Sequence, residues 1–257
     1  MDHILAGLTP EQMVAKVLNR SSISQESSLP EYKCSKCKDR GYQIEIDGGG
    51  YECARECECR VKARTEMIIA KSGISDAFRA CTFDNYHALD EILAGAKATA
   101  QAYVEAFDGI EHEQSNSFLL VGEVGSGKTM LGVCILNALT ARGISVLYAP
   151  YRDMVAALKG NVLDDALYRR ELERLIKPRV LFIDDLYKGA TQNDPKYMYD
   201  VINARYLAKK PIIVTSELNA DQMLDKDEAV ASRILQMSRN FIYEIRGEGL
   251  NYRLRGL

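Results

Sequence analysis

The segment at residues 122–129, Gly-Glu-Val-Gly-Ser-Gly-Lys-Thr, restricts the fold of this chain more than any other feature. An apolar run at residues 118–121 leads into it, and a helical run rich in Leu, Val and Ile follows to about residue 141. Glycines let successive backbone N–H groups curve around phosphate oxygens, and the start of the following helix adds the positive end of its dipole. A strand, a glycine-rich loop and a helix in this order predict a phosphate-binding P-loop within an α/β fold.

The chemistry of a P-loop assigns ATP and Mg²⁺ to this segment. We expect the Lys128 ammonium to reach the β- and γ-phosphates and the Thr129 hydroxyl to bind Mg²⁺. The residues predicted to hold the nucleotide are Gly122, Glu123, Val124, Gly125, Ser126, Gly127, Lys128, Thr129 and Met130.

A second motif supports the first. Residues 180–185, Val-Leu-Phe-Ile-Asp-Asp, form an apolar strand that ends in two carboxylates, as in a Walker B segment. We expect Asp184 to hold Mg²⁺ through water and Asp185 to polarise the water that attacks ATP. Most ATPases of this kind carry the longer Glu at the second position. With Asp185 there, we expect an ATPase that is slow and stimulated by its partners.

Polar residues close the next predicted strand, at residues 212–215, and one of them could sense the γ-phosphate: Thr215, Ser216 or Glu217. Ser and Thr are also common at capped strand ends, so the choice stays open. Further along, Arg233 and Arg239 lie six residues apart on a predicted helix, and Arg253 lies near the C-terminus. Arginines in these places suit arginine-finger and phosphate-sensing roles in a site shared between subunits.

Five of the seven cysteines fall between residues 34 and 59. Cys34-x2-Cys37 and Cys57-x-Cys59 supply four thiolates for a tetrahedral, structural Zn²⁺, and Cys53 is a substitute ligand. A glycine-rich turn at residues 47–50 predicts a hairpin between the two cysteine pairs. An iron–sulfur centre and free thiols are the alternatives.

The remaining pattern predicts the organisation of the chain. Short apolar runs alternate with helical stretches beyond residue 118, which predicts a parallel sheet flanked by helices on both faces. We expect an N-terminal helix at residues 1–20 and a Ser-rich linker at residues 21–31. A small zinc-binding region with its following helix then spans residues 32–72, and the ATPase domain spans residues 73–257.

Charge and hydropathy exclude some classes of protein. The 257 residues carry a net charge of -3, which argues against a protein that coats nucleic acid with its whole surface. The longest apolar runs fall far short of the roughly 20 residues needed to cross a bilayer, and the N-terminus has no secretory signal. We therefore expect a cytoplasmic protein without a membrane partner, in which disulfides are disfavoured.

The order of these motifs resembles a known family, the bacterial and phage helicase loaders of the DnaC/DnaI type, which are AAA+ ATPases related to the replication initiator DnaA. The resemblance runs from about residue 32 to the C-terminus. It rests on the P-loop together with residues 34–42, 57–60, 72–74 and 81–86, the last reading Cys-Thr-Phe-Asp-Asn-Tyr.

The resemblance implies roles for individual residues. Lys128 and Thr129 match the nucleotide-binding pair, and Asp184 with Asp185 matches the Walker B acids. Arg233 looks like the arginine finger, with Arg239 as second choice, and Arg253 looks like the second sensor arginine. Family members usually have Asn at the position of Glu217.

The resemblance also implies a function: ATP-dependent loading of a hexameric replicative DNA helicase, with contacts to single-stranded DNA and a homo-oligomer when ATP is bound. Two alternatives remain. One is a transposition helper ATPase of the IstB type, whose ATPase core is nearly the same. The other is a nucleotide-gated DNA-binding adaptor with little turnover, which Asp185 and the acidic charge balance favour.

Overall fold

The computed structural model describes residues 32–46, 48–71, 80–191 and 194–254. The predicted N-terminal helix and linker lie outside these residues. The predicted hairpin is confirmed: β1 (Tyr42–Ile46) pairs antiparallel with β2 (Glu52–Glu56), and α2 (Glu58–Lys71) follows. None of the helices that the structure describes combines the length and hydropathy required to span a membrane.

A parallel sheet organises the ATPase domain. Within the described residues it has five strands in the order β4-β5-β6-β3-β7, so the strand that precedes the P-loop lies between two partners distant in sequence. The strands are β3 (Phe118–Gly122), β4 (Val146–Pro150), β5 (Val180–Leu186), β6 (Ile212–Ser216) and β7 (Ile242–Ile245). Since parallel strands share their carboxyl ends, the P-loop and the Walker B carboxylates emerge at the same edge of the sheet.

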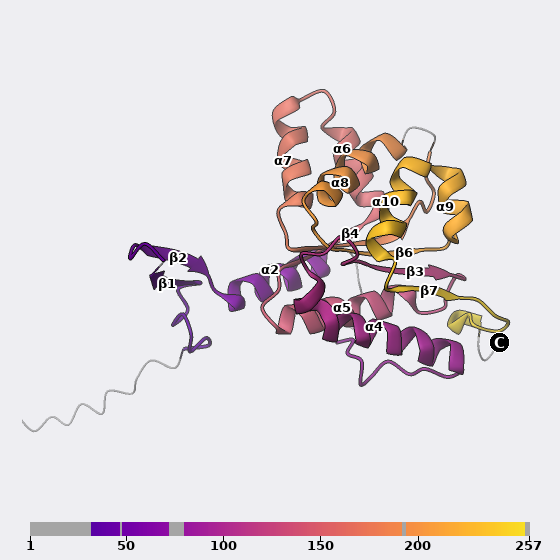
Figure 1. Ribbon diagram of the computed structural model, residues 1–257, viewed down its shortest axis with the longest axis horizontal. Helices are drawn as coiled ribbons and strands as arrows, with labels where there is room; N and C mark the ends of the chain where they lie inside the picture. Colours follow the sequence, from indigo (N-terminus) through magenta and orange to yellow (C-terminus); the bar gives the residue numbers. More distant parts are fainter. Residues whose placement is uncertain (1–31, 47, 72–79, 192–193, 255–257) are drawn as a thin grey trace, which may run out of the picture. The chain divides into compact units, whose positions relative to one another are not determined.

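Helices cover both faces of this sheet, as Figure 1 shows. One layer, drawn below the sheet, contains α4 (Glu91–Ile110) and α5 (Lys128–Ala141). The other contains α6 (Tyr151–Gly160), α7 (Asp165–Ile176), α8 (Asp194–Leu207), α9 (Ala220–Lys226) and α10 (Glu228–Ser238). A short 3-10 helix, η1 (Tyr252–Leu254), follows β7. The predicted α/β fold with a flanked parallel sheet is confirmed.

Alternation along the strands explains why two layers form. In β3, Phe118 and Leu120 belong to the core on the α4–α5 side, whereas Leu119 and Val121 belong to the core on the opposite side. Successive strand residues point to opposite faces, so a strand that is apolar at every position must be buried on both. The continuous apolar runs read from the sequence follow from this burial.

A buried arginine ties the second layer to the strand starts. Arg205 of α8 is fully buried, and its guanidinium donates to carbonyl oxygens at the end of α7 and before β5 and β6. Within the described residues the five acceptors are Leu175, Ile176, Pro178, Arg179 and Pro211. Buried carbonyls need donors, and the planar, permanently charged fork of Arg supplies them together.

Two details of the C-terminal half differ from the sequence-based expectation. β7 was not predicted, because its four residues include the charged Glu244 and form an edge strand with little apolar signal. Arg239 does not lie on the predicted helix with Arg233. The helix α10 ends at Ser238, and Arg239 is its C-cap.

Candidate nucleotide-binding site

A cavity of about 620 Å³ opens at the carboxyl edge of the sheet. The P-loop contributes residues 124–130 to its lining, and β5 contributes Asp184 and Asp185. The other lining residues come from four further segments: Tyr86, His87, Lys188, Glu217, Tyr252 and Arg253. A cavity of this size is ordinary for a nucleotide-sized ligand.

Glycines give the P-loop its curvature. Gly125 and Gly127 have φ values of 73° and 84°, in the left-handed region that side chains with a Cβ rarely adopt. A Cβ on Gly125 would also lie 2.0 Å from Asn251 Oδ1, and the Tyr252 N–H donates to the Gly125 carbonyl at 3.0 Å. The loop therefore packs closely against the C-terminal segment, which brings Arg253 to the cavity.

Lys128 lies at the start of α5 and is 5% exposed. Its ammonium donates to the carbonyl oxygens of Gly122 at 2.8 Å and Glu123 at 2.6 Å. Burial lowers the pKa of Lys128, and the nearby carboxylates of Glu217, Asp185 and Asp184 oppose that change. The ammonium is thus a largely buried cation beside three carboxylates, and its charge suits phosphate oxygens.

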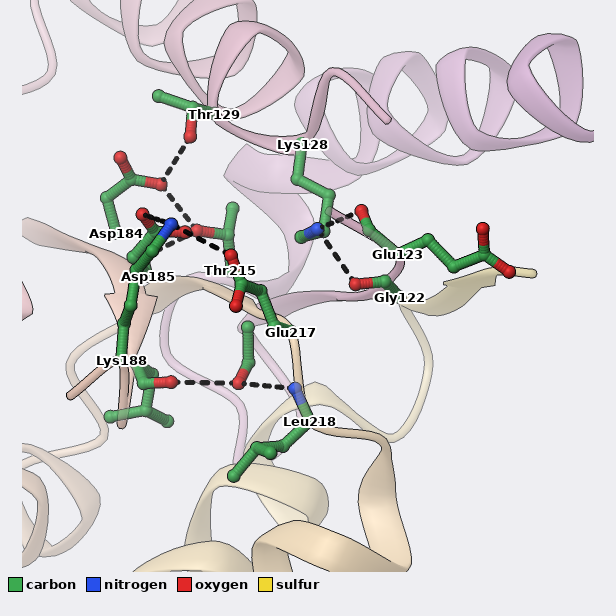
Figure 2. A network of polar contacts seen from close by, with 12 residues as sticks. Gly122, Glu123, Lys128, Thr129, Asp184, Asp185, Lys188, Thr215, Glu217 and Leu218 are labelled. Atoms are coloured by element: carbon green, nitrogen blue, oxygen red, sulfur yellow. Dashed lines mark hydrogen bonds and ion pairs between the residues drawn. The ribbon is translucent and has the colours of Figure 1, made fainter. Parts of the chain in front are cut away.

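Asp184 accepts hydrogen bonds from three hydroxyl groups, shown in part in Figure 2. Thr129 donates to Oδ1 at 3.0 Å, Tyr148 donates to Oδ2 at 2.8 Å, and Thr215 also donates to Oδ1. Burial raises the pKa of the Asp184 carboxyl, and these hydrogen bonds oppose the rise. The adjacent hydroxyl of Thr129 and carboxylate of Asp184 are hard oxygen ligands that fit Mg²⁺.

Asp185 occupies an irregular position in β5. Its φ is 55°, and the pairing with β6 shifts register between Ile183 and Leu186. The Asp185 N–H donates to the Thr215 hydroxyl at 2.9 Å, which holds the residue in this conformation. The shift turns the Asp185 side chain into the cavity, where its carboxylate could accept a hydrogen bond from water.

The structure separates the three candidates for a γ-phosphate sensor. Thr215 is buried and bonded to the Walker B segment, and the Ser216 hydroxyl donates to the Leu186 carbonyl at 2.9 Å. Of the three, Glu217 alone lines the cavity. Its carboxylate forms an ion pair with Lys188 at 2.8 Å.

Aromatic side chains form another part of the wall. The Tyr252 hydroxyl donates to the His87 carbonyl at 2.7 Å, which connects the segment before α4 to the C-terminus. The Tyr86 hydroxyl is buried and has no hydrogen-bond partner among the described residues. A buried polar atom without a partner at a cavity wall fits a ligand with polar groups, and the rings can stack on a purine base.

Some residues that the sequence predicted for the nucleotide site do not line the cavity. Gly122 and Glu123 do not line it and contribute only carbonyls to Lys128. Arg233 lies on α10, where its guanidinium stacks on the rings of Tyr199 and Tyr206. Its Nε donates to Asn203 Oδ1 at 3.2 Å. Since Arg233 does not line the cavity of its own chain, it could act on a bound nucleotide only at the cavity of another subunit.

Sequence reasoning also missed residues of the site. Lys188 sits in a turn, where one Lys carries no pattern, and Tyr148 reads as an ordinary core residue of a strand. Tyr86 lies in the segment 81–86, which supported the family resemblance. This resemblance was the one signal in the sequence that could have assigned Tyr86 to the site.

The four cysteines predicted to bind zinc form one cluster. The sulfur atoms of Cys34, Cys37, Cys57 and Cys59 all lie within 4.8 Å of one another. Zn–S bonds of about 2.3 Å in a tetrahedron place sulfur atoms about 3.8 Å apart, so the donor set fits a structural zinc site. Cys53 lies exposed on β2 and is not part of the cluster.

The strand order and the P-loop together define a P-loop protein with an AAA+ fold. The chain belongs to the family described as IstB-like ATP binding protein, whose model matches residues 63–256.

Two relatives from Bacillus subtilis span nearly the whole chain. The phage-like element PBSX protein XkdC is 33% identical, with 90% of each chain covered. The uncharacterized protein YqaM is 32% identical, with 91% of this chain and 89% of that protein covered.

Replicative helicase loaders are also similar. DnaC of Escherichia coli is 31% identical over 62% of this chain and 64% of that protein. A crystal structure of the DnaC helicase loader has a TM-score of 0.58 at 21% identity, covering 67% of this chain and all of that one. The resemblance to AAA+ proteins of the DnaC type is therefore confirmed.

Proposed function

We propose that this chain is an ATP-hydrolysing loader of a replicative DNA helicase. The observation that carries the proposal is the P-loop cavity on an AAA+ fold joined, in one chain, to the cluster of four cysteines. Similarity to DnaC, a replicative helicase loader, supplies the choice of partner. Similarity to XkdC of a phage-like element is compatible with loaders encoded by phages.

Side chains of the cavity have the chemistry that ATP hydrolysis requires. Lys128 and Arg253 would neutralise phosphate charge, and Thr129 with Asp184 would hold Mg²⁺, which would supply further positive charge to the phosphates. Asp185 would accept a hydrogen bond from the attacking water. Its short side chain and its ion pair with Lys188 at 2.9 Å support slow hydrolysis that a partner accelerates.

Assembly would link nucleotide binding to loading. Arg233 lies outside the cavity of its own chain, and this placement suits a role in completing the site of a neighbouring subunit. ATP would then favour a homo-oligomer on the helicase, and hydrolysis would release it. We place this activity in the cytoplasm, with single-stranded DNA as a further ligand.

The cysteine cluster would hold Zn²⁺ as a structural ion. Four thiolates leave no open coordination position, so the ion would stabilise the segment rather than act on a substrate.

Binding to a helicase tests the proposal. The purified chain is mixed with the replicative helicase of its source organism, with ATP and Mg²⁺, with ADP, or without nucleotide, and complexes are separated by size-exclusion chromatography. We expect a complex that is strongest with ATP and lost in Lys128→Ala. Absence of a complex under all three conditions would reject the loader function.

The DNA contact has its own test. Affinity for single-stranded DNA should fall steeply between about 50 and 200 mM salt, since Lys and Arg contacts to phosphates release counterions. An affinity that does not change with salt would argue against a DNA contact made by these side chains.

A transposition helper of the IstB type is the second candidate, because the matching family is named for IstB-like proteins. The two functions differ in the partner. A chain that binds a transposase in an ATP-dependent manner, and no replicative helicase, would be assigned to the transposition class.

A further inference from the structure

Lys188 forms a bridge between two carboxylates of the nucleotide cavity. Its Nζ lies 2.9 Å from Asp185 Oδ2 and 2.8 Å from Glu217 Oε1, and Figure 2 shows the three side chains together. All three line the cavity. Asp185 extends from β5, Glu217 follows β6, and Lys188 lies in the turn after β5, so the bridge connects neighbouring strand ends.

The backbone holds Lys188 in this position. Asp185 and Tyr187 have φ values of 55° and 66°, and the Lys188 N–H donates to the Asp185 carbonyl at 3.0 Å. Two left-handed residues, one on each side of Leu186, reverse the direction of the chain sharply. Such conformations are costly for residues with a Cβ, so the surrounding structure must hold them in place. Because of this reversal, the Lys188 side chain returns to the cavity and does not extend into solvent.

The bridge matters because of the charge it balances. Asp185 and Glu217 bring two carboxylates to one part of the cavity lining, and like charges at short range repel. Lys188 supplies the compensating positive charge. All three side chains are partly exposed, at 33%, 30% and 42%, so each interaction is moderated by solvent and can be exchanged for another.

Lys128 and Lys188 face the same space. The carboxylates of Glu217 and Asp185 raise the pKa of Lys128, and the ammonium of Lys188 lowers it, although burial is the largest influence. Both lysines therefore act electrostatically on the region beside the P-loop. An anion there would meet Lys128 from the P-loop side and Lys188 from the Walker B side.

We propose that Lys188 distinguishes ATP from ADP. The γ-phosphate of ATP competes with Asp185 and Glu217 for the Lys188 ammonium, whereas ADP has no group that reaches it and leaves the bridge intact. Transfer of Lys188 to the γ-phosphate frees the Asp185 carboxylate to accept a hydrogen bond from water. This role rests on the proposed binding of ATP, and it assigns the sensing of the γ-phosphate to a cationic residue that contacts Glu217.

Equilibrium binding of fluorescent ATP and ADP analogues with Mg²⁺ tests the role of Lys188. In Lys188→Ala we expect the Kd for the ATP analogue to rise at least tenfold and the Kd for the ADP analogue to change less than twofold. In Lys188→Arg, which keeps the charge, ATP affinity should largely recover. Glu217→Gln removes one competitor for Lys188, so it should tighten ATP binding several-fold relative to ADP.

Lys196→Ala is the matched control, because Lys196 lies on α8 outside the cavity lining and stacks on the Tyr197 ring. It should leave both affinities unchanged. Equal losses of ATP and ADP affinity in Lys188→Ala, or no loss of either, would overturn the role of Lys188.

The outcomes also separate this role from the proposed function. A wild-type chain that binds neither nucleotide would reject the ATP site itself. If the wild-type chain binds both nucleotides, and Lys188→Ala and Glu217→Gln change the Kd values for ATP and ADP equally, only the role of Lys188 is rejected. If Lys188→Ala is shown by thermal melting not to fold, the opposite shift expected of Glu217→Gln decides the result.

Discussion

Replacing Tyr148 with Phe removes one hydroxyl group beside Asp184 and little else. The Tyr148 hydroxyl donates to Asp184 Oδ2 at 2.8 Å, and its ring meets Phe182 edge-on at a centroid distance of 5.1 Å. Phe keeps the ring and its packing. The variant therefore isolates the contribution of one hydrogen bond to Asp184.

The expected change in Mg²⁺ affinity follows from the strength of a hydrogen bond to a charged carboxylate. A hydrogen bond to a charged group contributes about 1.5–3 kcal/mol to a folded structure. If its loss weakens the orientation and ionisation of Asp184 by the same amount, a binding constant changes roughly ten- to hundredfold. Thr129 and Thr215 still donate to Oδ1 in the variant, so we expect the lower end. The Mg²⁺ concentration for half-maximal ATP binding should rise about tenfold at pH 7.

The pH dependence has a definite sign. Burial already raises the pKa of Asp184, and loss of a hydrogen bond to its charged form raises it further. In the proposed site Asp184 would bind Mg²⁺ as a carboxylate, so binding would be present above its pKa and would be lost as the pH falls through it. The variant should lose Mg²⁺-dependent ATP binding at a higher pH than the wild type.

The assay is a Mg²⁺ titration of fluorescent ATP binding at several pH values. Tyr151→Phe is the control, because it also removes a buried hydroxyl, one that donates to Asp194 at 3.4 Å and not to the cavity. Identical Mg²⁺ titrations for wild type and Tyr148→Phe at every pH would refute the role assigned to this hydrogen bond.

Three further predictions test other parts of the structure. Arg205→Met should destabilise the chain by about 3 kcal/mol, because buried carbonyl oxygens lose their donor, and lower its melting temperature by roughly 6–12 °C; an unchanged melting curve would contradict this. Cys37→Ser should lose bound zinc in elemental analysis while Cys53→Ser retains it, and equal zinc contents would exclude the four-cysteine site. Gly125→Ala should weaken nucleotide binding at least tenfold, because its Cβ would meet Asn251 in a left-handed conformation; normal affinity would show that the loop tolerates it.

Local patterns made much of the fold predictable. The P-loop, the apolar strands and α5 each carry their signal within a few consecutive residues, and burial on both faces leaves residues 118–121 of β3 and residues 180–183 of β5 apolar throughout. The strand β7 lacked this signal because it is an edge strand whose Ile242 and Glu244 are exposed. Its place in the sheet comes from pairing with β3, which no local pattern records.

The site was predictable where one residue type is required at one place in a motif. Lys128 and Asp184 follow from their positions in the P-loop and Walker B motifs, whereas Lys188 depends on two left-handed residues that turn the chain back. Tyr148 depends on the pairing of β4 with β5, which places it beside the Walker B strand. Contacts of this kind arise from tertiary structure, so the sequence motif alone does not contain them.

Loading of helicase onto closed circular single-stranded DNA tests the central claim most directly, because a closed circle admits a helicase ring only if the ring opens. Labelled circles are incubated with helicase, ATP and either the wild-type chain or Lys128→Ala, and bound helicase is measured after a high-salt wash. The account predicts salt-resistant helicase on the circles with the wild-type chain and background levels with Lys128→Ala. Equal loading by both chains, or none by the wild type, would contradict it.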